Sequence, residues 1–290
     1  MGAAPADGIG VVDKAAGWTS HDVVAKARSV LGTRKVGHAG TLDPDATGVL
    51  VLGVGRATRL LRFLTALPKR YTTEVVLGVE TSTLDASGEV TATHAMGGTG
   101  LGEVREAARA FLGEIDQTPP MVSAVRVGGR RLHELAREGV EVERLARRVT
   151  IHELVVEDAD DEGVFRLEVV CSSGTYVRSL AADLGRALGG GAHLRRLRRT
   201  AVGSFDESEA REVDHVELLP PSEALRDYPS VTVDATMATA VRHGRVTSAA
   251  TLGVSGDGPW GVLDSDGRLL AVYDRHGPTD VKPTVVVAGG

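Results

Sequence analysis

GHAGTLDPDATGVLVLG, residues 37–53, joins a glycine-rich loop to an apolar run. Gly37, Gly40 and Gly48 permit tight turns and close backbone approach, because glycine has no Cβ to restrict its conformation. Asp43 stands at the centre of the loop, directly before Pro44, which favours an extended backbone at the residue that precedes it. The loop is therefore either an ordinary Asp-Pro turn or a scaffold that presents a carboxylate.

Positive charge flanks this carboxylate on both sides in the sequence. Arg34 and Lys35 precede the loop, and Arg56 and Arg59 follow it. Nearby cations favour the ionised form of a carboxyl group, which keeps that group available as a nucleophile or a general base. The surroundings of Asp43 thus favour a chemical role over a simple turn.

The patterns on either side of the loop predict a mixture of helices and strands. Upstream, a short strand at 10–12 precedes a helix that Thr19 or Ser20 caps and Gly32 ends. Downstream, apolar periodicity and turn residues predict further elements: a helix through 60–64, a strand at 72–80, helices at 101–112 and 131–137, strands at 149–156 and 164–171, and a helix at 177–188.

The character of the chain changes around Pro220 and Pro221, after which short β-like segments dominate. These segments lie at 230–233, 260–263, 269–273 and 284–287, with a hairpin turn predicted at Asp266-Gly267. We therefore expect a disordered tail at 1–8, a main domain at 9–228 and a small β-rich domain at 229–290.

Net charge taken alone argues against a polyanionic partner, because 33 basic side chains face 39 acidic ones in 290 residues. The charges are segregated, however. Residues 34–70 hold seven basic side chains against two acidic, residues 178–199 hold six against one, and residues 126–148 hold seven against four. A nucleic-acid surface needs a local basic face and not a basic total, so these segments are either RNA-binding or simply solvated.

Cysteine usage and hydropathy limit the cellular setting. One cysteine, Cys171, excludes an internal disulfide and argues against a thiolate zinc site, so we expect no bound metal. A reducing, cytoplasmic location is the corresponding prediction. No apolar stretch approaches the roughly 20 residues that a membrane-spanning helix needs, and the N-terminus lacks the pattern of a signal peptide.

Three further segments carry candidate functional residues. Lys69-Arg70-Tyr71 places a tyrosine behind two cations in a chain with few aromatic residues, and such a ring can stack on a base. The segment 171–178 passes from a strand through a small-residue turn into a helix. Arg178 lies in the first turn of that helix, where the helix dipole disfavours a cation, so we expect it to have an anionic partner. The third segment, HLRRLRR at 193–199, binds phosphates or forms a solvated arginine face.

In this order and spacing, GHAGTLDPDATGVL, KRYTTEVVLG, CSSGTYVRSLAADLG and AHLRRLRRTAVG resemble the tRNA pseudouridine synthase B (TruB) family. The resemblance covers roughly residues 9–205 and rests on several separated motifs. It implies isomerisation of the uridine at position 55 in the T arm of tRNA, without a cofactor and with tRNA as the partner. Nothing in the sequence suggests an obligate oligomer, so we expect a monomer. It also implies an α+β fold with a mixed, mainly antiparallel central sheet flanked by helices, and a PUA-like C-terminal domain.

The resemblance assigns roles to residues of this chain. Asp43 matches the catalytic aspartate, Tyr71 the ring against the target base, and Arg178 the arginine that pairs with the catalytic carboxylate. His38 matches the histidine that contacts the T loop. The remaining candidates for binding substrate or RNA are Tyr176, Leu197, Arg198, Arg199, Lys14 and Lys69. Asp45 departs from the family pattern, which has Leu or Met there, and we expect it to point to solvent.

The chemistry of pseudouridine formation agrees with this set of residues. The reaction breaks the N1–C1′ bond and joins C5 to C1′ without net redox change, so it needs a carboxylate near the sugar and a pocket for an extruded base. Covalent attack and removal of a sugar proton both remain open for Asp43. Two alternatives are a non-catalytic RNA-binding or RNA-folding protein and, through Gly53-Val54-Gly55, a nucleotide-cofactor enzyme whose fingerprint Thr58 breaks.

Overall fold

The computed structural model describes residues 7–122 and 142–287, together with residues 126, 127, 130, 131, 138 and 140. The chain forms two compact units: the first joins Met1–Leu67 to Ala201–Gly290, and the second is Pro68–Thr200. The helix predicted at 131–137 lies almost wholly outside the described residues, as does most of the predicted tail. The first strand already begins at Gly8.

The first unit is built around β1 (Gly8–Lys14), which pairs antiparallel with β3 (Thr47–Val54) along its whole length. β14 (Leu218–Leu219) pairs with the other edge of β1, and β2 (Val36–His38) pairs antiparallel with β3. The helical and short elements around this sheet are α1 (Ser20–Val30), η1 (Gly55–Leu60), α2 (Leu61–Ala66), β13 (Phe205–Asp206), η2 (Val213–His215) and η3 (Pro221–Leu225).

Thr19, one of the two residues predicted to cap this helix, is the N-cap of α1. Its side chain accepts a hydrogen bond from the Asp22 amide, and the Asp22 carboxylate accepts one from the Thr19 amide at 2.8 Å. This capping box satisfies backbone donors that have no partner within the helix. The second candidate, Ser20, is buried and has a different task, described below.

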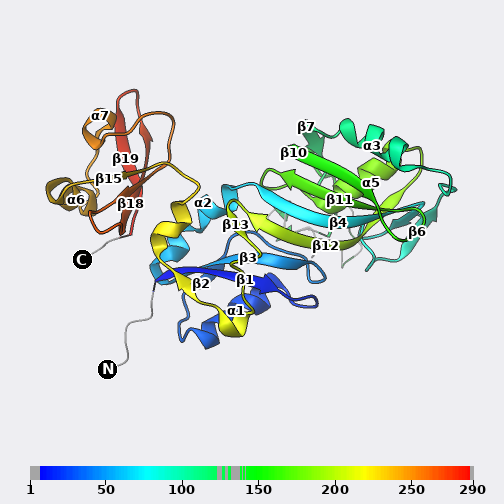
Figure 1. The fold of residues 1–290 in the computed structure, drawn as a ribbon, viewed down its shortest axis with the longest axis horizontal. Helices are drawn as coiled ribbons and strands as arrows, with labels where there is room; N and C mark the ends of the chain where they lie inside the picture. The colour runs from blue at the N-terminus through cyan, green and yellow to red at the C-terminus, as the bar shows by residue number, and fades with distance from the viewer. Residues whose placement is uncertain are drawn as a thin grey trace. The chain divides into compact units, whose positions relative to one another are not determined.

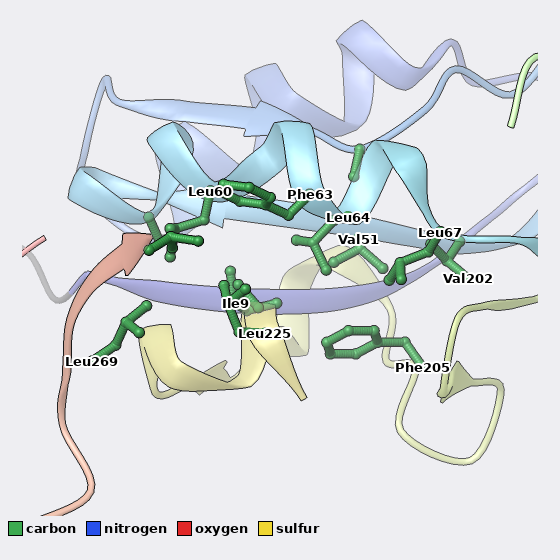
Figure 2. Close-up of a cluster of buried hydrophobic side chains, with 14 of the residues drawn as sticks. Ile9, Val51, Leu60, Phe63, Leu64, Leu67, Val202, Phe205, Leu225 and Leu269 are labelled. Carbon is green, nitrogen blue, oxygen red and sulfur yellow. The ribbon is translucent and has the colours of Figure 1, made fainter. Parts of the chain in front are cut away.

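A buried apolar cluster holds the first unit together (Figure 2). Leu60, Phe63 and Leu64 of η1 and α2 lie on one side of Ile9, and Phe205 and Leu225 lie on the other. The same cluster takes in residues of the C-terminal strands, namely Leu269, Val272, Val285 and Val287. Residues on both sides of position 228 therefore share one core, and the domain boundary at 228/229 stays a prediction.

The second unit is a sheet with the strand order β12-β4-β11-β10-β7 (Figure 1). The pairs β4–β11, β11–β10 and β10–β7 are antiparallel. The elements of this unit are β4 (Lys69–Leu77), β5 (Val79–Thr81), β6 (Val90–Thr93), α3 (Leu101–Arg109), β7 (Gly113–Gln117), β8 (Arg126–Val127), β9 (Arg130–Arg131), β10 (Arg147–Asp158), β11 (Val164–Cys171), α5 (Val177–Ala187) and β12 (Ala192–Val202).

The arginine-rich segment at 193–199 lies within β12, an 11-residue strand that the sequence patterns do not predict. Its Leu-Arg-Arg repeat lacks the alternation of apolar and polar residues by which a half-buried strand is recognised. Arginine stems can cover apolar surface while the charged head finds a partner, so a strand can carry them at partly buried positions.

The C-terminal part of the first unit is rich in β-strands, as predicted. Its elements are β15 (Ser230–Thr232), α6 (Ala235–Arg242), β16 (Thr247–Ser248), α7 (Ala249–Leu252), β17 (Trp260–Leu263), β18 (Leu269–His276) and β19 (Asp280–Val286). They form a five-stranded sheet in the order β15-β17-β18-β19-β16 around Trp260 and Tyr273. The helix α6 was not predicted.

The predicted class is confirmed: the chain is mixed α+β, its central sheet pairing is mainly antiparallel, and its C-terminal part is β-rich. Across the described residues, no helix combines the length and apolar character needed to cross a membrane.

Leu64→Ala should lower the free energy of unfolding by about 2–5 kcal/mol, because deleting a fully buried side chain leaves a cavity in the core. Leu145, which is 78% exposed, is the control, and Leu145→Ala should change stability by no more than about 0.5 kcal/mol. Urea unfolding followed by circular dichroism measures both. Equal effects of the two substitutions would contradict the assignment of Leu64 to the core.

Candidate functional site

The loop between β2 and β3 presents Asp43 from an anchored backbone. Leu42 and Ala46 are buried on either side, whereas Asp43 is partly buried and Asp45 is exposed. The amide of Ala46 donates to the Asp43 carbonyl at 3.1 Å, which closes a tight turn. The expectation that Asp45 points to solvent is confirmed.

Two glycines give this loop its shape. Gly40 and Gly48 have φ values of 103° and 100°, a region that residues with a Cβ rarely adopt. The loop geometry thus depends on the glycines that made the segment conspicuous in the sequence.

Ser20, at the start of α1, holds the loop from one side. Its buried hydroxyl accepts a hydrogen bond from the Leu42 amide at 2.9 Å and donates to the Leu42 carbonyl at 3.3 Å. One side chain therefore satisfies both backbone groups of the residue that precedes Asp43. Sequence reasoning noticed Ser20 only as a possible helix cap.

Lys14, at the end of β1, is the second residue that holds the loop, through the Pro44 carbonyl. Its side chain is fully buried, and its ammonium donates to the carbonyls of Pro44 at 2.9 Å, Ala15 at 2.9 Å and Trp18 at 2.6 Å. The three carbonyls take the place of water around a buried charge, which would otherwise be costly. The structure thus gives Lys14 a supporting position, and its direct contact with RNA stays a prediction.

His38, on β2, is partly buried and faces a second histidine. The rings of His38 and His21 lie edge to face, with centroids 5.5 Å apart and an interplanar angle of 80°. His21 is exposed at the beginning of α1 and was not among the predicted site residues. A histidine two positions after the capping residue of a helix was the available signal.

In the second unit, one face of β4 carries Lys69, Tyr71 and Thr73. All three are nearly buried, with exposed fractions of 6%, 9% and 3%. Strand alternation places them on the same side of the sheet, whereas Arg70 is exposed. The predicted ring Tyr71 and the predicted cation Lys69 therefore share a face.

Burial and one neighbouring cation shift the pKa of Lys69. Burial and the neighbouring Arg199 guanidinium lower the pKa of Lys69 to about 8, against an ordinary value of 10.5. Burial also raises the pKa of the Cys171 thiol, the register partner of Lys69, to about 11. Both shifts follow from desolvation, which disfavours the charged form of each group.

Arg178 lies at the second position of α5 and is 4% exposed. Its Nη1 donates to the Thr83 carbonyl at 2.9 Å, and its Nη2 donates to the Val122 carbonyl at 2.8 Å. Asp85 Oδ2 lies 3.6 Å from Nη1. The expectation that Arg178 has an anionic partner is confirmed by Asp85, and its pairing with Asp43 stays a prediction.

Asp85 is a residue that sequence reasoning missed. It lies in the turn between β5 and β6, where its Oδ1 accepts hydrogen bonds from the Thr83 hydroxyl at 2.6 Å and from the Ser87 hydroxyl at 2.5 Å. Leu84 beside it has φ 63°, a strained conformation for a residue with a Cβ. The Leu84 carbonyl accepts from the Leu194 amide at 3.0 Å, which ties this turn to β12. An Asp-Ala-Ser-Gly turn motif was the available signal.

Two arginines of β12 form ion pairs with carboxylates, and the other two are partly or fully buried. Arg195 pairs with Glu74 at 2.8 Å and with Asp161 at 2.6 Å, and Arg196 lies 3.3 Å from Glu74. The predicted residues Leu197 and Arg198 are partly buried, and Arg199 is 1% exposed. Contact of these three residues with RNA stays a prediction.

Tyr176 is the N-cap residue of α5, and its backbone is held by Gln117. Among the residues that the structure describes, no group of three His, Cys, Asp or Glu side chains is placed to hold a metal ion.

Family models match most of the chain. Residues 28–177 match the TruB family pseudouridylate synthase N-terminal domain, and residues 178–226 match the tRNA pseudouridylate synthase B C-terminal domain. A tRNA pseudouridine synthase B of Thermobifida fusca is 45% identical over 98% of this chain and 99% of that protein. One of Nocardia farcinica is 47% identical over 94% of this chain and 91% of that protein.

Solved structures agree on the fold. A chain in a crystal structure of a Cbf5-Nop10-Gar1 complex superposes with a TM-score of 0.75 at 24% identity, covering 97% of this chain and 85% of that one. A chain in the structure of an H/ACA RNP bound to a substrate RNA containing 2′-deoxyuridine gives a TM-score of 0.71 at 22% identity, covering 97% and 85%.

Lys69→Met should remove a pH-dependent part of the stability. Between the folded pKa of about 8 and the ordinary value of 10.5, the unfolded chain binds a proton that the folded protein lacks, so wild-type stability gains from rising pH in this window. The difference in unfolding free energy, variant minus wild type, should therefore fall by about 3 kcal/mol from below to above the window.

Urea unfolding at several pH values measures this difference. Cys171 titrates with the opposite trend and is present in both proteins. Lys69 is the smallest of the causes that shift the pKa of Cys171, so most of the Cys171 contribution cancels. Lys35→Met, which changes an exposed lysine in the same way, serves as the control. A flat difference for Lys69→Met would contradict the assigned shift.

Proposed function

The chain belongs to the TruB family of pseudouridylate synthases, and on this basis we propose that it isomerises the uridine at position 55, in the T arm of tRNA. The full-length relatives named tRNA pseudouridine synthase B support tRNA as the substrate. The observation that carries the proposal is the anchored loop, in which a partly buried carboxylate is held between buried neighbours by Ser20 and Lys14.

Asp43 is the catalytic residue of this proposal. Breaking the N1–C1′ bond leaves the sugar carbon short of electrons, and a carboxylate can attack C1′ or remove a sugar proton. The base then turns over and C5 joins C1′, while the proton from C5 is lost and N1 gains one. A backbone fixed on both sides of Asp43 keeps the carboxylate oriented toward the reacting sugar, which is the condition for efficient positioning.

The second unit supplies the other groups in this proposal. We assign Tyr71 to the target base and Arg178 to keeping the Asp43 carboxylate ionised, since a guanidinium favours the charged form of a nearby carboxyl group. Flipping a nucleotide out of its stack costs a few kcal/mol, and stacking on an aromatic ring can offset that expense. The near burial of Tyr71 and Arg178 fits a water-poor site.

RNA binding is assigned to the remaining candidates. His38 is proposed to contact the T loop, Leu197 to line the apolar pocket, and Tyr176 to bind substrate or RNA. Lys69, Arg198 and Arg199 contribute positive potential toward the phosphates. Lys14 supports RNA binding by holding the loop that carries Asp43.

We also propose a division into a catalytic domain at 9–228 and a PUA-like RNA-binding domain at 229–290, a monomeric state and a cytoplasmic location. The β-rich C-terminal sheet supports the small second domain. The single cysteine agrees with a reducing compartment.

Asp43→Asn should abolish pseudouridine formation while tRNA binding survives, because an amide neither attacks the sugar nor accepts its proton at a useful rate. The exposed Asp45 offers a matched control two positions away, and Asp45→Asn should retain activity within about threefold, as expected of a surface change without such a role. Mapping pseudouridines in tRNA treated with each protein measures both the reaction and its position.

Wild-type protein that binds tRNA but forms no pseudouridine would favour the non-catalytic RNA-binding alternative. Modification at a position other than 55 would keep the enzyme class and overturn the proposed specificity.

Arg178→Ala should reduce the rate severely, by about 100-fold or more, because it leaves Asp85 without its cation and removes a positioned charge from the site. Arg178→Lys should retain part of the activity, since it keeps the charge but lacks the forked guanidinium that reaches two carbonyls and a carboxylate. Single-turnover rates on tRNA measure both, and equal rates for Ala and Lys would contradict a role for the charge.

A further inference from the structure

Gln117 is the inward-facing end of an otherwise largely exposed edge strand. It is the last residue of β7 and is 2% exposed, whereas Gly113, Glu114 and Asp116 are exposed. A buried amide side chain is unfavourable unless its oxygen and nitrogen both find partners. Its contacts therefore indicate why a polar residue stands at this position.

The amide of Gln117 pairs with both backbone groups of Tyr176. Its Oε1 accepts from the Tyr176 amide at 2.7 Å, and its Nε2 donates to the Tyr176 carbonyl at 3.0 Å. That carbonyl also accepts from the Leu180 amide at 3.1 Å, which is the first hydrogen bond of α5. The Gln117 side chain thus pairs with Tyr176 as the backbone of a neighbouring strand would, and it fixes the backbone at the first residue before α5.

The residues that follow Gln117 hold the next turn of α5. The Ser179 hydroxyl donates to the Thr118 carbonyl at 3.0 Å, and Arg178 Nη2 donates to the Val122 carbonyl at 2.8 Å. Gln117, Thr118 and Val122 therefore contact Tyr176, Ser179 and Arg178, respectively. The Tyr176 side chain makes no cap hydrogen bond, and the Gln117 side chain supplies a hydrogen bond to each of the two backbone groups of Tyr176.

We propose that Gln117 is a positioning residue for catalysis, acting through the Tyr176 backbone on the direction in which Arg178 leaves α5. This inference rests on the proposed pseudouridine synthase function. A shift of about 1 Å in a positioned group can reduce a rate by about 100-fold. A change in the Tyr176 backbone that moves the Arg178 guanidinium by this distance would therefore lower the rate. Gln117 itself touches neither substrate nor reacting atoms in this scheme.

Gln117→Met keeps the length of the side chain and removes both hydrogen bonds. We expect the single-turnover rate constant to fall by about tenfold or more, with affinity for tRNA within about twofold of wild type. Gln117→Glu keeps the acceptor for the Tyr176 amide but places oxygen against the Tyr176 carbonyl, and it should be impaired as well. A wild-type rate in a folded Met or Glu variant overturns the proposal.

Tyr228→Phe is the matched control for a general loss of stability. Tyr228 and Phe63 both lie in the first unit, whereas Gln117 lies in the second. The substitution removes the 2.8 Å hydrogen bond from the Tyr228 hydroxyl to the Phe63 carbonyl, and the rate should stay within about twofold of wild type. A rate loss in this control equal to that of Gln117→Met would mean that stability, and not positioning, sets the rate.

A double-mutant cycle identifies the path of the effect. In an Arg178→Lys background, Gln117→Met should lower the rate by much less than it does in wild type, because the group that it positions has already been changed. Equal losses in both backgrounds overturn the proposal. Hydrogen exchange over residues 176–182 should be faster in Gln117→Met, and this readout does not depend on activity. A wild-type enzyme that forms no pseudouridine would instead refute the proposed function.

Discussion

The buried ammonium of Lys14 is the interaction on which the first unit's site depends. A fully buried charge is tolerated only when its donors are satisfied, and here the carbonyls of Ala15, Trp18 and Pro44 accept them. Because Pro44 directly follows Asp43, the hydrogen bond from Lys14 to the Pro44 carbonyl also fixes the loop that carries Asp43. Ser20 adds a second attachment at Leu42, so the aspartate is held from both neighbours.

The second unit concentrates buried cations in the same way. Lys69, Arg178 and Arg199 are each less than a tenth exposed. Burial, and after it the neighbouring Arg199 guanidinium, lowers the pKa of Lys69. A positive potential of this kind destabilises the free protein but favours a polyanionic substrate and an ionised carboxylate. Net charge over the whole chain, which is negative, conceals this arrangement.

Local patterns predicted the elements that carry strong local signals. The cap at Thr19, the glycine loop before β3 and the strand β11 follow from residues that act on their own neighbours. β12 was missed because its partly buried arginines hide the alternation of a strand. Two of its charges, Arg195 and Arg196, pair with Glu74 and Asp161, which lie far away in the sequence, so no local pattern could show that a strand there is stable.

The sequence by itself determined the family, the α+β class and the carboxylate at Asp43, since these depend on motifs and spacings within short segments. It also predicted an anion near Arg178, because a cation in the first turn of a helix opposes the helix dipole. Only the tertiary structure decided that Asp85 is such a partner, that Gln117 sets the backbone of Tyr176, and that Lys14 and Arg199 are buried. The physical reason is that burial and hydrogen bonding join residues distant in the chain, and their energies depend on the surroundings that folding creates.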